Sequence, residues 1–529
     1  MVVVILCVAC IIMLCVLAEK FSDKLGMPAL IMFMFIGMLF GSDGVFKIPF
    51  EDFKLAESVC SVALIFIMFY GGFNTKWQAA KSVAGRAIAL STVGVVFTAI
   101  LTAVCCTYFL KFSWLESILI GSVLSSTDAA SVFAILRKNK LNLKDGTASI
   151  LEVESGSNDP LSYLLTLVAI NLLNNSGQNN ILLMVIFQIV FGVMTGVIFA
   201  KLIIWIMTKT KIISEGLETI FMIAMVLGCY SVTSLIGGNA YLSVYLGGII
   251  IGNSRIPYKK TLIPFFDGVT SLAQIMIFFL LGLLTFPKEM VDFIPRALGI
   301  VAILTLIARP IAVMFLMLPL KCKKSQIGLI SWAGLRGASS SVFAIMAVSS
   351  GVAMEQDLFH IVFMVTLFSV GIQGTLLPYV SKMLNMVDES ADVRKTFNDY
   401  QEESMFTLMR MFIPKGHNWE NRLIKDVSMP TGALSMMIKR GDKTIITKGD
   451  TRILAGDSII LNVPSYEPEG AEELQETLID RKHPWCNQRI SELNLPGNVL
   501  IVMILRGSEN IIPDGKTIIC ENDIVVTYK

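Results

Sequence analysis

Apolar segments follow one another with few breaks over residues 1–386, and this succession constrains the fold more than any other feature. Segments of roughly 15 to 25 apolar residues can cross a bilayer as helices, which rise about 1.5 Å per residue. They begin near residues 2, 27, 56, 85, 114, 147, 180, 217, 239, 267, 295, 326 and 357. The chain is 54% hydrophobic and 16% charged, and its mean hydropathy is +0.70. These observations predict an α-helical polytopic membrane protein with about 13 transmembrane helices.

Basic residues are distributed unevenly over the loops between these segments. Short loops rich in Lys and Arg face the cytoplasm in most membrane proteins. We therefore expect the N-terminus outside and the C-terminal domain in the cytoplasm. The net charge is only +2, whereas binding of nucleic acid requires a clustered basic face. Nucleic acid is therefore excluded as a partner. The basic loops lie at 20–24, 76–86, 137–144, 209–211, 255–260 and 321–324.

The composition changes after residue 386, where charges become frequent and the apolar runs shorten to the length of β-strands. The stretch 417–461 aligns without gaps on 483–527, so the tail contains an internal repeat. We predict a small α+β cytoplasmic domain here. The predicted division is a transmembrane domain at 1–386, a linker at 387–403 and two repeats at 404–464 and 465–529.

Asp128, Glu154 and Asp159 are acidic residues within otherwise apolar segments, and they are the candidates considered for function. A carboxylate at the centre of a bilayer costs at least about 2.5 to 3.5 kcal/mol, so it needs a cavity, a partner or a bound cation. Asp128 and Asp159 are therefore candidates for binding an ion. For Glu154 two interpretations stay open, because it can form a buried ion pair with Arg336 or act directly in transport.

Helical spacing groups polar side chains around Asp159. Glu154 and Asn158 lie one turn apart, as do Ser155 and Asp159, on adjacent stripes of one helix. One face of the helix thus offers a hydroxyl, an amide and two acids. Oxygen ligands of this kind bind hard cations, so a small metal ion or a proton is expected at this face.

Thr127 with Asp128, and the stretch 334–337, interrupt two apolar segments with residues that disfavour a continuous helix. Such interruptions are typical of the discontinuous helices of transporters, whose unwound carbonyls complete ion sites. Their placement, in the fifth and twelfth segments, suits an inverted repeat. If a proton and a metal ion compete for the same acids, the two fluxes are coupled without a separate proton path.

Several stretches resemble the monovalent cation/proton antiporter superfamily, and especially its NhaP-type potassium/proton members. The resemblance covers essentially all of residues 1–386. It is carried by SSTDAASVF (125–133), LEVESGSNDP (151–160), VYLGGIIIGN (244–253), FDGVTSLAQIMIFFLLGLL (266–284) and SWAGLRGA (331–338).

The resemblance implies an NhaA/NhaP-like fold in the bacterial cytoplasmic (inner) membrane, a homodimer in the lipid bilayer, and exchange of cytoplasmic K⁺, or Na⁺, for H⁺ by alternating access. It implies that Asp159 binds the ion and the proton, next to Asn158, and that Asp128 and Thr127 are its partners on the crossed helix. Asp128, Asp159 and Ser155 would then hold a monovalent cation. Glu154 and Arg336 resemble a structural ion pair beside the site. The pair Asn158–Asp159 implies electroneutral exchange.

The tail repeats resemble the RCK-C subdomain. No Gly-rich Rossmann fingerprint precedes either copy, so we expect no NAD- or ATP-binding subdomain and no other cofactor. The tail would instead bind a small regulatory ligand, and the family suggests a nucleotide second messenger such as cyclic di-AMP. The candidate regulatory residues recur in both copies: His417, Trp419, Arg440, His483, Trp485 and Arg506.

Two other classes compete with an antiporter. RCK-like tails also accompany ligand-regulated cation channels, but the sequence contains no TVGYG-type carbonyl filter. An intramembrane aspartyl protease would need two aspartates that share a proton, whereas Asp159 lies among ligand-type oxygens. We therefore expect a transporter and not an enzyme.

Overall fold

In the computed structural model the chain forms two compact units, Met1–Tyr400 and Gln401–Lys529, and each is described by itself. Most of the predicted linker lies outside the residues that the structure describes. The described residues are 2–25, 28–77, 81–139, 141–174, 180–209, 216–388, 406–427, 429, 434–440, 443–464, 474–479, 483–493, 500–506, 509–511, 513–521 and 523–528.

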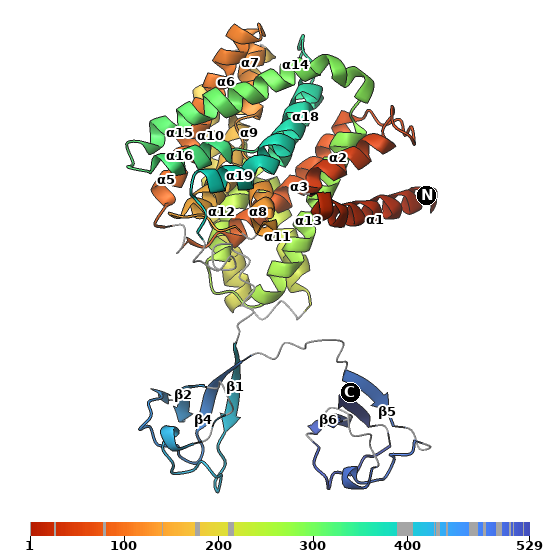
Figure 1. Ribbon diagram of the computed structural model, residues 1–529, viewed down its shortest axis with the longest axis vertical. Helices are drawn as coiled ribbons and strands as arrows, with labels where there is room; N and C mark the ends of the chain where they lie inside the picture. The colour runs from red at the N-terminus through yellow and green to blue at the C-terminus, as the bar shows by residue number, and fades with distance from the viewer. Residues whose placement is uncertain are drawn as a thin grey trace. The chain divides into compact units, whose positions relative to one another are not determined.

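The first unit is helical (Figure 1). Its first half contains α1 (Val2–Leu25), α2 (Ala29–Phe40), α3 (Phe53–Asn74), α5 (Ala84–Ala89), α6 (Val95–Phe109), α7 (Trp114–Val123), α8 (Ala129–Lys138), α9 (Thr147–Leu173) and α10 (Ile181–Lys209). Its second half contains α11 (Glu218–Leu235), α12 (Ala240–Gly252), α13 (Lys259–Leu283), α14 (Pro287–Ile303), α15 (Arg309–Met317), α16 (Lys324–Trp332), α17 (Ala338–Ser349), α18 (Leu358–Phe368) and α19 (Thr375–Met383). Three π-helical turns, Leu90–Gly94, Leu304–Ala308 and Ser369–Gly374, join α5 to α6, α14 to α15 and α18 to α19.

Some of the helices begin at side chains that cap them. The side chains of Asp52, Ser113 and Asp357 accept hydrogen bonds from backbone N–H groups in the first turns of α3, α7 and α18. Eight helical stretches among the described residues are long and apolar enough to cross a membrane. α9 is 27 residues long but carries the acids of the site. The predicted number of thirteen spans stays a prediction.

Two apolar stretches are broken in their middles, as predicted. The first break separates α7 from α8 at residues 124–128, and the second separates α16 from α17 at residues 333–337. The backbone N–H of Asp128 in the first break donates to the carbonyl of Leu335 in the second, at 2.8 Å. The two discontinuous helices therefore meet at their unwound segments.

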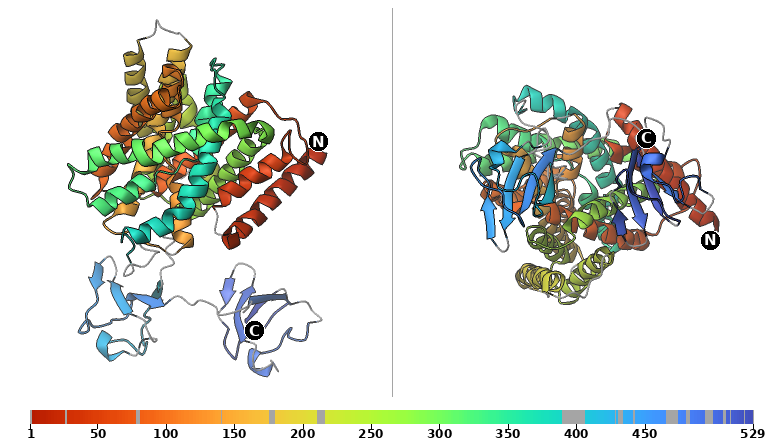
Figure 2. Two further views of the ribbon diagram at one scale, coloured as in Figure 1. Left: turned by 45° about the horizontal axis from the view of Figure 1, so that its top comes forward. Right: turned by 90° about the horizontal axis from the view of Figure 1, so that it is seen from below.

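Contacts between helices divide the first unit into two sets. The scaffold set contains α1, α2, α3, α10, α11, α12 and α13; the site set contains α5 to α9 and α14 to α19. Figure 2 shows α1 and α2 side by side at the edge of the unit. Within the scaffold set the backbones approach closely, and a Cβ on Gly282 of α13 would lie 2.1 Å from the Met34 carbonyl of α2. The two sets meet mainly where α17 packs on α3 and α9 on α12.

The second unit contains two four-stranded antiparallel sheets with the same strand order, which agrees with the repeat in the sequence. The first sheet, in the order β1-β4-β2-β3, is built from β1 (Phe406–Phe412), β2 (Leu434–Arg440), β3 (Lys443–Ile446) and β4 (Ser458–Pro464). The second, in the order β5-β8-β6-β7, is built from β5 (Leu474–Leu478), β6 (Leu500–Arg506), β7 (Glu509–Ile511) and β8 (Ile524–Tyr528). Each sheet has its own apolar cluster, around Ile438 and Ile459 in the first and Ile504 and Val525 in the second.

Candidate functional site

Asp159 lies in the middle of α9 and faces the breaks of both discontinuous helices. Its side chain is only 4% exposed. Ser126, in the first break, donates a hydrogen bond to one carboxylate oxygen of Asp159. Ser339, in the first turn of α17, donates to the other at 2.6 Å. Both oxygens of the central acid are therefore held by hydroxyls from two different broken helices.

Thr127 contacts the same helix face at two points. Its carbonyl accepts a hydrogen bond of 2.7 Å from the Ser155 hydroxyl, and its own hydroxyl accepts one of 2.5 Å from the Asn158 amide. The Oδ1 atom of Asn158 is buried, with no hydrogen-bond partner among the described residues. Thus Ser155 and Asn158, which the helical spacing grouped with Asp159, anchor the unwound backbone beside it.

Asp128 begins the second half of its broken helix and is held there by its own chain. The backbone N–H of Ser131 donates to Asp128 at 3.2 Å, and the Ser131 hydroxyl donates to the other carboxylate oxygen. Asp159 lies within electrostatic range of Asp128. A Cβ on Gly337 would lie 2.1 Å from Asp128 Oδ2, so only glycine leaves room for this carboxylate. The structure thus brings all five predicted ion-site residues together.

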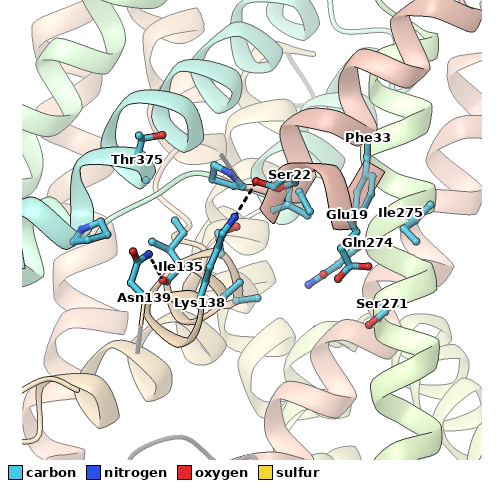
Figure 3. Close-up of a pocket in the computed structure, with 18 of the residues that line it drawn as sticks. Glu19, Ser22, Phe33, Ile135, Lys138, Asn139, Ser271, Gln274, Ile275 and Thr375 are labelled. Carbon is cyan, nitrogen blue, oxygen red and sulfur yellow. Dashed lines mark hydrogen bonds between the residues drawn. The ribbon is translucent and has the colours of Figure 1, made fainter. Parts of the chain in front are cut away.

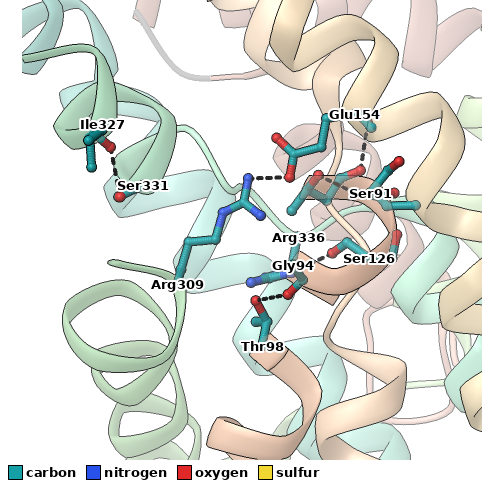
Figure 4. Close-up of polar contacts among 12 residues, drawn as sticks. Ser91, Gly94, Thr98, Ser126, Glu154, Arg309, Ile327, Ser331 and Arg336 are labelled. Atoms are coloured by element: carbon teal, nitrogen blue, oxygen red, sulfur yellow. Dashed lines mark hydrogen bonds and ion pairs between the residues drawn. The ribbon is translucent and has the colours of Figure 1, made fainter. Parts of the chain in front are cut away.

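The buried ion pair beside the site differs from the prediction. Glu154 Oε1 lies 2.6 Å from Nη2 of Arg309, and both side chains are at most 3% exposed. The N–H bond does not point at the oxygen, so the attraction is one of close charges rather than an aligned hydrogen bond. Arg336, the predicted partner, instead donates from Nη1 to the Ser126 carbonyl at 2.6 Å. Figure 4 shows Arg309 directed at Glu154 and Arg336 beside Ser126.

Arg309, and not Arg336, is the partner of Glu154 because of the position that each arginine has in the fold. Arg309 is the first residue of α15, directly after a π-helical turn, and from there its side chain reaches α9. Arg336 lies in the second break, which meets the first, and its Nη1 donates to the carbonyl of Ser126. Arg336 thereby ties the two breaks together and still lies within electrostatic range of Glu154.

A cavity of about 430 Å³ reaches this region between the two helix sets (Figure 3). Its walls come from α1, α2 and α13 on one side and from α8 and α19 on the other. Ser131, which holds Asp128, lines the cavity, and Glu19 and Gln274 add polar groups. The Lys138 ammonium spans the two sides and donates to the Ser22 carbonyl at 2.9 Å. The cavity therefore lies next to Ser131, the residue whose hydroxyl holds Asp128.

The candidate regulatory residues of the tail have structural partners in both repeats. Nδ1 of His417 accepts from the Trp419 backbone at 3.1 Å, and Nδ1 of His483 accepts from the Trp485 backbone at 3.2 Å. Arg440 and Arg506 each pair with a buried aspartate, at 2.8 Å from Asp457 and 2.7 Å from Asp523. These contacts fix the turns of each repeat.

These pairs determine the charge state of the two aspartates. Burial by itself raises the pKa of Asp457, but hydrogen bonds from Arg440 and from the Leu454 N–H outweigh it and hold the pKa below its ordinary value. Asp523 is held in the same way by Arg506 and the Cys520 N–H, and its pKa is lowered too.

The sequence now places the chain among known proteins. Residues 9–382 match the family described as sodium/hydrogen exchanger, transmembrane. The chain belongs to the sodium/hydrogen exchanger family. Residues 474–526 match the TrkA-C domain, so the RCK-C-like resemblance is confirmed for the second repeat. As a member of this family the chain is a multi-pass membrane transporter with a C-terminal soluble domain, and not an enzyme.

Relatives with recorded functions cover most of the chain. The K(+)/H(+) antiporter NhaP of Alkalimonas amylolytica is 30% identical over 467 residues, covering 86% of this chain and 80% of that protein. The K(+)/H(+) antiporter NhaP2 of Shewanella oneidensis is 30% identical over 449 residues, covering 84% of this chain and 78% of that protein. The resemblance to NhaP-type members that the sequence indicated is thus confirmed.

A solved structure shares the fold of the exchanger domain. It is that of the sodium proton antiporter MjNhaP1 from Methanocaldococcus jannaschii, with a TM-score of 0.63 and 21% identity, covering 72% of this chain and 99% of that chain. The predicted fold class, an NhaP-like helical membrane protein with a small C-terminal domain, is confirmed.

Proposed function

We propose that this protein exchanges cytoplasmic K⁺, or Na⁺, for H⁺, and that Asp159 binds the two ions in turn. The observation that carries the proposal is the position of Asp159: it is buried at the meeting point of both broken helices, near Asp128. A carboxylate there requires a positive partner. The described contacts of Asp159 are with neutral hydroxyls, so a transported cation or proton would supply that charge.

The chemistry follows from what one carboxylate can hold. A proton on Asp159 neutralises it and removes the attraction for a metal ion, while a bound metal ion repels the proton. The hydroxyls of Ser126 and Ser339 can rotate, so they donate to the empty carboxylate and offer lone pairs to a cation. Thr127, Ser155, Asn158 and Asp128 would complete the oxygen shell. Release of one ion is then required before the other binds, and the two fluxes are coupled.

The choice of K⁺ rests on the two relatives named as K(+)/H(+) antiporters. One-for-one electroneutral exchange rests on the family resemblance of the pair Asn158–Asp159. We also propose a homodimer in the bacterial inner membrane, with the N-terminus outside and the tail in the cytoplasm, as the basic loops indicate. The division at residues 386, 403 and 464 is part of the same proposal.

We further propose that the tail regulates exchange through the loop between α8 and α9. The backbone N–H of Asp388 donates to the Asn142 carbonyl at 2.9 Å, and the N–H of Lys144 donates to the Met386 carbonyl at 2.9 Å. This short antiparallel pairing attaches the start of the tail to the segment between the helices of Asp128 and Asp159. A small ligand of the tail, such as cyclic di-AMP, would act along this route.

Purified protein in liposomes that enclose a pH-sensitive dye tests the exchange itself. A proton gradient is imposed, and K⁺, Na⁺, Li⁺ or Ca²⁺ salts are added in turn, with the membrane voltage clamped at zero. The proposal expects proton movement that depends on the cation, greatest with K⁺, or with Na⁺. Cation flux without any proton movement would indicate a channel and contradict the proposal.

A further inference from the structure

A group of aromatic side chains lies close to the ion site, beyond Asp159 along α9. Tyr163 lies on α9 one turn after Asp159, and its ring centroid is 4.9 Å from that of Tyr241 on α12 and 5.8 Å from that of Phe343 on α17. Tyr241 also contacts the ring of Tyr230 on α11, at 5.3 Å. Tyr241 and Phe343 are at most 3% exposed. These four rings, here called the aromatic plug, join the scaffold set to the site set.

A half-buried carboxylate, Glu57 of α3, lies beyond the aromatic plug. The hydroxyl of Ser349, the last residue of α17, donates to it at 2.5 Å. Glu57 is within electrostatic range of the hydroxyls of Tyr163 and Tyr230. Because Glu57 belongs to the scaffold set and Ser349 to the site set, this hydrogen bond crosses the same boundary as the plug.

Helix α17 orders these groups along one line. Ser339 contacts Asp159 in the first turn, Phe343 joins the plug one turn later, and Ser349 meets Glu57 at the end. At 1.5 Å per residue, Ser349 lies about 15 Å along the helix axis from Ser339. Pro378 and Tyr379, which line the cavity, belong to α19, the last helix before the tail.

We propose that Glu57 is the carboxylate at which the transported cation enters or leaves on the side opposite the tail, and that the aromatic plug is the closed gate between Glu57 and Asp159. This inference rests on the proposed exchange of a cation for a proton. A cation needs a charged group as it leaves bulk water, and Glu57 provides one in front of the gate. The hydrogen bond from Ser349 keeps the gate shut while the cavity on the other side is open.

Side-resolved kinetics test the role of Glu57. The Glu57→Gln variant keeps the length and the acceptor oxygen of the side chain but removes its charge. In liposomes, protease accessibility of the tail reports the orientation, and the KM for K⁺ is measured from each side. We expect the KM on the side opposite the tail to rise about tenfold, as for loss of one contact to a charged group, with the KM on the tail side unchanged.

Glu51→Gln is the matched control, since Glu51 is an exposed carboxylate shortly before Glu57 in the chain. It should leave both KM values unchanged. A KM on the side opposite the tail that is the same in Glu57→Gln as in the unchanged protein, with normal exchange by the unchanged protein, would overturn the inference and leave the proposed function intact. Absence of cation-dependent exchange in the unchanged protein would contradict the proposed function itself.

Variants of Ser349 provide a second measurement, which separates the effect of the Ser349–Glu57 hydrogen bond from the effect of the charge on Glu57. Ser349→Ala removes the hydroxyl but leaves Glu57 charged, so the gate should open more easily and the KM on the Glu57 side should fall. Ser349→Thr restores a hydroxyl and should restore the KM. If Ser349→Ala and Ser349→Thr both leave the KM on that side unchanged, the hydrogen bond does not hold the gate.

Discussion

The backbone N–H of Asp128 donates a 2.8 Å hydrogen bond to the carbonyl of Leu335, so the breaks of two discontinuous helices are joined directly. Each break also supplies a contact around Asp159, through Ser126 from the first and through the Ser339 turn that follows the second. The ion site is therefore one connected polar structure inside an apolar helical unit. Substitutions at the contacts between the two breaks should therefore affect transport before they affect the fold.

The close approach of Gly337 to Asp128 gives the first prediction. Gly337→Ala places a Cβ 2.1 Å from Asp128 Oδ2, so the carboxylate must move and exchange should fall to a small fraction of its normal rate. Gly85→Ala is the matched control, because a Cβ there meets no atom within 4 Å. Exchange rates in liposomes, with yield and monodispersity as checks on folding, measure the effect. Normal exchange by Gly337→Ala would show that the contact with Asp128 is not required.

The buried ion pair gives the second prediction, which separates the two arginines. Arg309→Met leaves Glu154 buried without its partner, and loss of one member of a buried pair costs about 3 to 5 kcal/mol of unfolding free energy. Adding Glu154→Gln should recover much of this loss. A double-mutant cycle on thermal stability should give a larger coupling for Glu154 with Arg309 than for Glu154 with Arg336. The reverse order would support the partner that the sequence indicated.

Much of the site could be predicted from the sequence because the spacing of residues along a helix, and the residues that interrupt it, can be recognised within a single segment. The spacing of Ser155, Asn158 and Asp159 along one helix, and the interruption at Thr127 and Asp128, were sufficient to group these residues. The repeat in the tail was equally visible, since both copies keep their order of strands.

The site residues that could not be predicted from the sequence are those whose role depends on contacts between distant segments. Ser126 and Ser339 occur in serine-rich stretches, and only the meeting of the two breaks selects them as donors to Asp159. Arg309 follows a π-helical turn, which shifts the helix face relative to a regular period of 3.6 residues. Periodicity alone could not show that it faces Glu154.

The paired aspartates of the tail give the third prediction. The lowered pKa values of Asp457 and Asp523 add stability that is fully present above the ordinary pKa of aspartate, about 3.9, and is lost as the pH falls through the lowered values. In Arg440→Gln, burial of Asp457 is no longer offset, so this stability is lost and the first sheet should be looser than the second already at neutral pH. Hydrogen-exchange mass spectrometry of β4 and β8 in the full chain measures this. Equal loosening of both sheets would contradict it.

The pairing between the start of the tail and the α8–α9 loop gives the fourth prediction. Asp388→Pro removes the N–H that donates to Asn142, whereas Asp388→Ala keeps that N–H and removes only the side chain. The tail effect is defined as the difference in pH dependence of exchange between the full chain and a chain that lacks residues 389–529. It should shrink in Asp388→Pro and persist in Asp388→Ala. Loss of the effect in both variants would assign it to the side chain.

Exchange by Asp159→Asn in liposomes, with the voltage clamped at zero, tests the role of Asp159 most directly. Asp292→Asn, on the exposed face of α14, is the matched control with the same chemical change. We expect cation-dependent proton movement to disappear in Asp159→Asn and to continue in Asp292→Asn, while both proteins stay folded. Undiminished exchange by a well-folded Asp159→Asn protein would contradict the role of Asp159 as the shared site of cation and proton.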